Sequence, residues 1–294
     1  MIPFVACVCA SFVAGAQTPV FRGGVETVEV TVTVTDANRR LITGLTRKDF
    51  AVYEDGRPET ITHFSNQRVP VSLGVLLDVS DSMRGQPMAD ARLALDRFVG
   101  DLLTAEDEAF VAAFHHSSWT VVDWTSPSDS LRGRLSDVRP SGGTSIYGAI
   151  AKTTPQFDRR RHMRSALVVV SDGADTASDL TLGQARESLR RSDPFVYAIA
   201  IDAGDPRRVS TRVTPSVLRE ITGPSGGYTE VIRTAAELGA ATERIAYELN
   251  HQYTIGYSAS RRPDGQWRSI RVRMRDRGHF ARARRGYFAI LRSN

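Results

Sequence analysis

The sequence has little cysteine, almost no lysine and no long apolar run after its first sixteen residues. Its 294 residues include two cysteines, Cys7 and Cys9, so neither disulfides nor cysteine-bound metals are expected to hold the fold together. After residue 16, no segment approaches the roughly 18 consecutive apolar residues that a transmembrane helix requires. A chain of this length that is 41% hydrophobic can bury a large core without disulfides or structural metals.

Residues 1–16 have the character of a signal peptide. Every residue from Ile2 to Ala16 is apolar or small, and Ala14-Gly15-Ala16 is a small-x-small pattern that suits cleavage before Gln17. We therefore expect a secreted or periplasmic protein with no membrane span after the leader. Because the usual basic start is missing, a cytosolic N-terminal extension stays open as an alternative, as does a lipid anchor on Cys7.

Arginine carries nearly all of the positive charge, since the only lysines are Lys48 and Lys152. The formal net charge is +5, and the segment from Arg261 onward holds +9 of it (eleven arginines, two aspartates), which leaves −4 for the rest. A basic tail is one signature of nucleic-acid or membrane binding. Within residues 270–275, however, the arginines alternate with apolar residues, as on the solvated face of a strand. We therefore expect no nucleic-acid partner.

Both ends of the chain carry the pattern of antiparallel β-structure. Residues 26–35 alternate valine with polar side chains, and Glu54-Asp55-Gly56-Arg57 is an Asp-Gly hairpin turn between two β segments, 50–53 and 59–64. Short β segments separated by glycine-bearing turns recur over residues 252–289. Two separate β domains of this size would be unstable alone. We therefore predict one β module built from residues 20–67 and 251–294.

Between these ends, strands alternate with helices. Near-continuous apolar runs at residues 71–77, 166–171 and 195–201 are typical of parallel strands that are covered on both faces. Further predicted strands are 108–115 and 119–124, and predicted helices begin near Pro87, at Ser145 with apolar positions as far as Phe157, and at capping boxes that start at Thr181 and Thr234. The pattern predicts a Rossmann-like, doubly wound, mostly parallel α/β domain over residues 68–250, inserted into a smaller β-sandwich-like module.

Oxygen-bearing side chains gather where the apolar strands end, the edge at which such sheets bind ligands. Asp78, Ser80 and Ser82 alternate, so their side chains can point the same way. The glycine-rich loop 140–145 can bring the Thr144 hydroxyl close, and Asp172 follows a later strand. An all-oxygen set of this kind suits a hard cation, Mg²⁺ first and then Mn²⁺ or Ca²⁺.

These motifs resemble those of the von Willebrand factor A (VWA) family. The matching features are Asp-x-Ser-x-Ser after the first apolar strand, a Gly-Gly-Thr-Ser loop and Ser-Asp-Gly after a later strand. The family has a Rossmann-like fold with a metal-ion-dependent adhesion site (MIDAS), and the resemblance covers about residues 70–250. It implies that the metal ligands are Asp78, Ser80, Ser82, Thr144 and Asp172. The flanking segments resemble bacterial secreted VWA-related proteins.

The resemblance also implies a function. A carboxylate from the partner completes the coordination of the ion in this family, so we expect cation-dependent binding of an Asp or Glu side chain on a protein or peptide. Asp81, Gly143 and Asp175 are expected at the rim of this site.

The sequence gives less support to other functions. We expect no Gly-x-Ser-x-Gly nucleophile elbow, and the sequence holds no phosphate loop ending in Lys-Ser/Thr and no His-Glu-x-x-His, so we expect no enzyme. Two alternatives stay open: a structural scaffold in which the metal only holds the loops together, and a Mg²⁺-dependent hydrolase.

Asp202 is expected as a structural cap near the site, and Trp119 and Trp124 as packing residues. The His115-His116 pair is expected at the rim, because adjacent strand residues face opposite ways.

Overall fold

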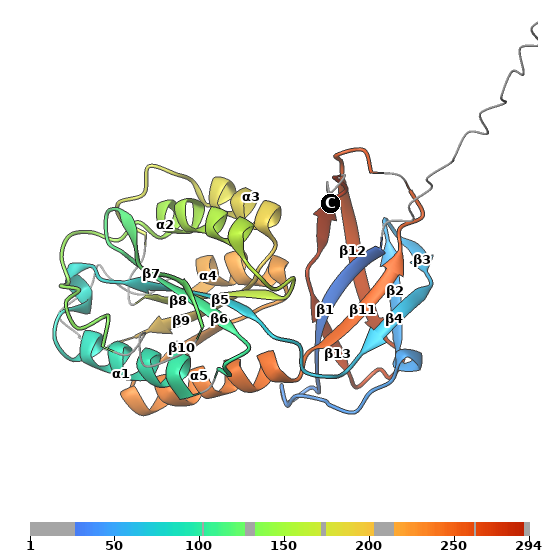
Figure 1. Ribbon diagram of the computed structural model, residues 1–294, viewed down its shortest axis with the longest axis horizontal. Coiled ribbons are helices and arrows are strands. Elements are labelled where there is room, and N and C mark those ends of the chain that lie inside the picture. Colours follow the sequence, from blue (N-terminus) through green and yellow to red (C-terminus); the bar gives the residue numbers. More distant parts are fainter. Residues whose placement is uncertain are drawn as a thin grey trace, which may run out of the picture.

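The computed structural model of the protein describes residues 27–101, 103–126, 133–171, 175–202, 215–261 and 263–290. Two units lie side by side, an α/β unit and a smaller β unit, and the chain crosses between them twice (Figure 1). The predicted signal peptide and Asp172 lie outside the described residues. Within those residues, no helix combines the length and the apolar character needed to cross a membrane.

The α/β unit is built on a six-stranded sheet with the order β10-β9-β8-β5-β6-β7. Strand β7 is antiparallel to β6, and the other neighbours are parallel. The strands are β5 (Ser72–Asp78), β6 (Glu108–Phe114), β7 (Ser118–Thr125), β8 (Ser165–Ser171), β9 (Phe195–Ile201) and β10 (Thr229–Ile232). The strands predicted from the apolar runs are therefore present, within a residue or two of the expected bounds.

Helices cover both faces of this sheet, which explains why its four inner strands, β5, β6, β8 and β9, are buried along their whole length. One face carries α1 (Gln86–Asp101) and α5 (Ala235–Asn250), and the other carries α2 (Ile146–Thr153), α3 (Leu182–Ser192) and α4 (Pro215–Thr222). Along β5, Leu73 and Val75 face α1 and α5, whereas Leu76 faces the opposite core. The predicted doubly wound, mostly parallel α/β fold is confirmed.

Capping side chains set two of the helix starts. Thr181 forms the predicted capping box with Gln184 at the start of α3. At α5 the Thr234 hydroxyl accepts a hydrogen bond from the Glu237 backbone N–H, as expected. The reciprocal half of that box was predicted wrongly, because the Glu237 carboxylate accepts from the backbone N–H of Arg233 instead.

The helix that starts after Ser145 is shorter than predicted. It ends as an α-helix at Thr153 and continues as a 3₁₀ helix, η3 (Thr154–Arg159). Pro155 has no backbone N–H and therefore cannot continue the α-helical hydrogen bonds. Phe157 still reaches the core, where its ring packs edge-on against the Phe110 ring. The other 3₁₀ helices in the described residues are η1 (Arg47–Asp49), η2 (Asp81–Met83) and η4 (Gly223–Ser225).

The β unit consists of two four-stranded antiparallel sheets, with the orders β13-β1-β11-β4 and β14-β12-β2-β3. Each sheet combines strands from both chain ends, and a shared core of valine and aromatic side chains lies between them. The strands are β1 (Thr27–Thr35), β2 (Phe50–Glu54), β3 (Arg57–Glu59), β4 (Ile61–Ser65), β11 (Tyr253–Ser258), β12 (Trp267–Met274), β13 (Phe280–Ala283) and β14 (Gly286–Phe288). The predicted smaller β module built from both ends is therefore confirmed as part of the fold class.

The Asp-Gly hairpin forms as predicted, but with a shorter second strand. Asp55 and Gly56 both have positive φ, +47° and +78°, the backbone that a tight two-residue hairpin requires. The strand expected at 59–64 is instead divided, because β3 pairs with β2 while β4 joins the other sheet and pairs with β11.

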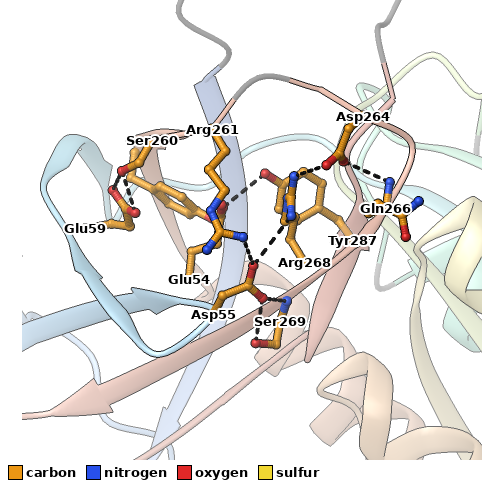
Figure 2. A network of polar contacts seen from close by, with 11 residues as sticks. Glu54, Asp55, Glu59, Ser260, Arg261, Asp264, Gln266, Arg268, Ser269 and Tyr287 are labelled. Carbon is orange, nitrogen blue, oxygen red and sulfur yellow. Dashed lines mark hydrogen bonds and ion pairs between the residues drawn. The ribbon is translucent and has the colours of Figure 1, made fainter.

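A polar network surrounds this hairpin (Figure 2). Asp55 accepts hydrogen bonds from the backbone N–H and the hydroxyl of Ser269, at 2.9 and 3.1 Å. The Arg268 guanidinium lies between two carboxylates, 2.6 Å from Asp264 and 3.7 Å from Asp55. The buried Glu54 accepts hydrogen bonds from two tyrosine hydroxyls. The network fixes the start of β12 beside the hairpin.

The two chain crossings are tied together. Arg68, on the way into the α/β unit, donates a hydrogen bond of 2.8 Å to the side chain of Asn250 at the end of α5, and it also pairs with the buried Asp107. Gln252, two residues after Asn250, is buried. Its amide donates hydrogen bonds to the hydroxyls of both Thr33 in β1 and Tyr197 in β9. Hydrogen bonds of side chains therefore connect the units where the chain passes between them.

Candidate metal centre

Asp78 ends the central strand β5 and is completely buried. Its Oδ1 accepts the backbone N–H of Ser80 at 2.8 Å, and its Oδ2 accepts the hydroxyl of Ser171 at 2.5 Å. These two bonds orient the carboxylate from both sides, one from its own loop and one from the neighbouring strand β8. Sequence reasoning missed the contribution of Ser171, whose only signal was its place beside the predicted ligand Asp172.

The two predicted serine ligands lie next to each other. The hydroxyl oxygens of Ser80 and Ser82 are 2.9 Å apart, and Ser80 is almost fully buried. Ligand oxygens at about 2.1 Å from Mg²⁺ in octahedral geometry are about 2.9–3.0 Å apart along an octahedral edge. The two hydroxyls are hydrogen-bonded to each other, and their spacing also matches that of adjacent Mg²⁺ ligands.

Backbone hydrogen bonds hold the glycine-rich loop against the Asp78 loop. Ser141 N–H donates to the carbonyl of Val79 at 2.8 Å, and Asp81 N–H donates to the carbonyl of Gly142 at 2.9 Å. Gly142 has a φ of +74°, and a Cβ at this position would lie 2.9 Å from the Nδ1 of His116. Glycine is therefore required here for both its backbone and its lack of a side chain.

Thr144 lies on this loop and is 4% exposed. Its backbone N–H donates to the Thr176 hydroxyl at 3.0 Å, and its carbonyl accepts the backbone N–H groups of Thr176 and Ala177. Thr144 is thereby joined to the segment that follows β8. Hydrogen bonds thus link three loops at the carboxyl edge of the sheet, and the Thr176 hydroxyl is a second positioning group that sequence reasoning did not identify.

The predicted rim residues surround these loops. The Asp81 side chain is 59% exposed and pairs with Arg84 at 2.7 Å, and Asp175 accepts a hydrogen bond from the Ser178 hydroxyl at 2.6 Å. A Cβ on Gly143 would lie 3.2 Å from the Cβ of Ala177. Each of these three residues therefore lies on or against one of the three loops. Asp202, at the end of β9, lies 3.7 Å from the Nε of Arg233.

The histidine pair was expected at the rim with its two rings facing opposite ways, and that orientation was wrong. Strand β6 ends at Phe114, so His115 and His116 lie in a turn rather than in a strand, and their rings stack at 4.0 Å with an interplanar angle of 16°. Burial, and next the neighbouring His116, lower the pKa of His115 below its usual value. The stacked pair lies against the glycine-rich loop through Gly142.

The donor chemistry of the site fits a hard cation. Asp78, Ser80, Ser82 and Thr144 supply only oxygen atoms, which Mg²⁺ and Ca²⁺ prefer. No group of three or more His, Cys, Asp or Glu side chains suited to a metal occurs in the described part of the chain. A site whose donors are mostly hydroxyls would not form such a group, and Asp172 is not among the described residues.

A Gly-x-Ser-x-Gly segment does occur at 223–227, but its serine has a structural role. The hydroxyl of Ser225 donates to the carbonyl of Thr222 at 2.7 Å and accepts the backbone N–H of Val196 at 2.8 Å. Ser225 lies in the 3₁₀ turn η4, which precedes β10, whereas a nucleophilic serine of this motif lies on a turn from a strand into a helix. The segment therefore gives no support to a hydrolase.

The fold and the loops at its carboxyl edge are similar to those of VWA-type domains. Residues 73–174 match the family profile of the von Willebrand factor type A domain, so the resemblance seen in the sequence motifs is confirmed over these residues. No curated protein matches the sequence.

Solved structures share the fold at low identity. A von Willebrand factor type A protein from Catenulispora acidiphila is 14% identical, with a TM-score of 0.55 over 90% of this chain and 73% of its own. An aerotolerance-related membrane protein from Bacteroides fragilis is 21% identical, with a TM-score of 0.51 over 61% of this chain and 98% of its own. The conserved hypothetical protein BatB from Bacteroides thetaiotaomicron is 20% identical, with a TM-score of 0.50 over 60% and 98%. The first of these matches extends well beyond the α/β unit.

Proposed function

We propose that this protein binds Mg²⁺ at the carboxyl edge of its α/β unit and uses the ion to hold an acidic side chain of a partner protein. The ligands would be Asp78, Ser80, Ser82, Thr144 and Asp172. The observation that carries the proposal is the 2.9 Å spacing of the Ser80 and Ser82 hydroxyls beside the buried, oriented carboxylate of Asp78. Mn²⁺ or Ca²⁺ would be weaker substitutes at the same oxygens.

The binding step follows from the charge of the donors. Hydroxyl ligands are neutral, so they leave a divalent ion with a strong remaining attraction for a carboxylate. An incoming Asp or Glu completes the coordination, while Asp81, Gly143 and Asp175 form the rim that the partner contacts. The protein acts as a binding module rather than as an enzyme, and the proposed signal peptide of residues 1–16 would direct it to the periplasm or out of the cell.

Calorimetric titration with Mg²⁺ tests the metal site. The native protein should bind, Asp78→Asn should lose at least about tenfold in affinity, and the control Asp81→Asn should be unchanged, because the Asp81 side chain is largely exposed and pairs with Arg84. Absence of Mg²⁺ uptake at millimolar concentration, or equal loss in both variants, would contradict the site.

A pull-down from the native envelope tests the partner. Capture should require Mg²⁺, fail in EDTA and fail with Asp172→Ala; an immobilised peptide with Glu should then bind better than its Gln counterpart. If Asp78→Ala lowered the melting temperature but left every interaction with a partner intact, the metal would serve only to stabilise the loops. Turnover of a phosphoester that disappears in the same variant would instead indicate a hydrolase.

A further inference from the structure

A cavity of about 220 Å³ lies between the two units, far from the metal edge. Its walls come from α3, α4 and η4 of the α/β unit and from β12 and the β13–β14 turn of the β unit. Pro194, which lines it, directly precedes β9, whereas the candidate metal ligand Asp78 ends the parallel strand β5. The cavity therefore opens at the amino edge of the sheet, opposite the carboxyl edge that carries the candidate metal centre.

The lining is strongly basic. Arg186, Arg190, Arg284 and Arg285 contribute four positive charges against the single negative charge of Asp193. Asp193 forms an ion pair with Arg284, so these two charges compensate each other. Arg186 and Arg190 form long ion pairs, at 3.7 Å from Glu220 and 3.8 Å from Glu187, and Arg285 has no ion pair with the described residues. An excess of positive charge therefore faces the cavity.

Only one nitrogen of the Arg186 guanidinium matters here, because its Nη1 lies 3.7 Å from Glu220. The Nε of Arg186 is buried and has no hydrogen-bond partner among the described residues. Buried N–H groups are almost always paired, and an unpaired one is unfavourable. The side chain of Arg186 is 33% exposed, and a carboxylate or phosphate can take two parallel N–H bonds from one guanidinium.

The apolar part of the wall is already in place. Leu189 and Ile221 are buried, and the ring of Trp267 lies under the guanidinium of Arg190, at 5.2 Å from its centroid. The backbone N–H of Arg285 donates to the carbonyl of Pro224, which fastens the β13–β14 turn to η4. The polar network of Figure 2 holds the residue that follows Trp267. The cavity is thus pre-formed by fixed elements of both units.

We propose that this cavity binds a small organic anion, in which a carboxylate or phosphate group is attached to a compact apolar body. Its volume is below the roughly 300–1,000 Å³ of sites for drug-sized ligands, so a ligand of the size of benzoate fits better than a larger one. The anionic group pairs with Arg186, and the apolar body lies against Leu189 and Trp267. Because the walls belong to both units, the bound anion also stabilises their contact.

Titration calorimetry of the full chain in EDTA and low-chloride buffer tests this site without the metal. Benzoate and phenyl phosphate are the two anionic probes, and they distinguish a carboxylate from a phosphate ligand; benzyl alcohol is the neutral control. At least one anion should bind at up to about 10 mM, and benzyl alcohol should not. No heat from either anion, or equal binding of the alcohol, would overturn the proposal.

Matched variants locate the binding. Arg186→Gln should weaken the anion by about tenfold or more, whereas Arg219→Gln should leave it unchanged, because Arg219 is an exposed arginine on α4 that does not line the cavity. Arg285→Gln, at an exposed position, gives a second test if Arg186→Gln folds poorly. Equal affinity in the Arg186, Arg285 and Arg219 variants would refute the assignment. Inorganic phosphate that binds as tightly as phenyl phosphate would refute the role of the apolar wall.

Discussion

Glu248 offers the sharpest test of how the two units are held together. Its side chain is 8% exposed at the C-terminal end of α5. Oε1 accepts hydrogen bonds from Tyr197 at 2.8 Å and from Thr33 of the β unit at 3.0 Å, and Oε2 lies 2.5 Å from the guanidinium of Arg282, also of the β unit. One carboxylate thus joins α5, β9 and two strands of the β unit. Replacement by alanine removes all of these bonds at once.

The expected cost follows from the burial of each partner. Thr33 and Tyr197 are completely buried, so their hydroxyls cannot turn to water after the substitution, and each hydrogen bond to a charged group contributes about 1.5–3 kcal/mol. Arg282 is 26% exposed and recovers part of its hydration, so its ion pair adds less. We expect Glu248→Ala to lower the free energy of unfolding by about 3–5 kcal/mol, the range for breaking one side of a buried pair.

Urea unfolding followed by tyrosine and tryptophan fluorescence measures this loss. Glu243→Ala is the matched control: it lies on the same helix and also pairs with an arginine, Arg97, but its side chain is 46% exposed. An exposed pair contributes about 1 kcal/mol or less. If the two variants lost equal stability, the carboxylate of Glu248 would not connect the units in the way described.

Three further changes have defined outcomes. Gly74→Ala should cost about 1–3 kcal/mol of stability in a thermal melt, because the new Cβ would lie 2.6 Å from the ring of Phe110; an unchanged melting temperature would show that the core yields there. Because the pKa of His115 is lowered in the folded protein, its contribution to stability is full above about pH 6.5 and is lost as the pH falls below that value. The melting temperature should therefore drop between pH 7.5 and 5, and by less in His115→Gln; equal drops would refute this. Ser171→Ala should lower the affinity for Mg²⁺ by about 10–100-fold, because it removes a hydrogen bond that orients the Asp78 carboxylate. Titration calorimetry that found native affinity would refute that role.

The centre of the sheet in the α/β unit was predictable because its inner strands have no solvent face. Apolar residues fill β5, β8 and β9, and no other common element needs such runs bounded by loop residues. The β unit was predictable from β1 for the opposite reason, since alternation marks one buried face. In both cases burial alone fixes the pattern, so composition along the chain was enough.

Features that depend on contacts between distant segments were not predictable. The stacking of His115 on His116 depends on the residue at which β6 ends, and the switch from β3 to β4 depends on which partner strand is nearby. Likewise, the Glu237 carboxylate accepts the backbone N–H of Arg233 rather than that of Thr234, because of the path by which the chain enters α5. None of these has a local signal.

The hydrogen bond from Ser171 to Asp78 shows the same limit within the candidate metal centre. Leu77 of β5 is in register with Val170 of β8, so the residues that follow them, Asp78 and Ser171, reach the carboxyl edge side by side. Both runs are apolar throughout, and a slip of two residues would keep every side chain on its own face while it moved Ser171 by about 6.6 Å. The sequence therefore predicts which residues reach this edge, but only the register determines which serine orients the carboxylate.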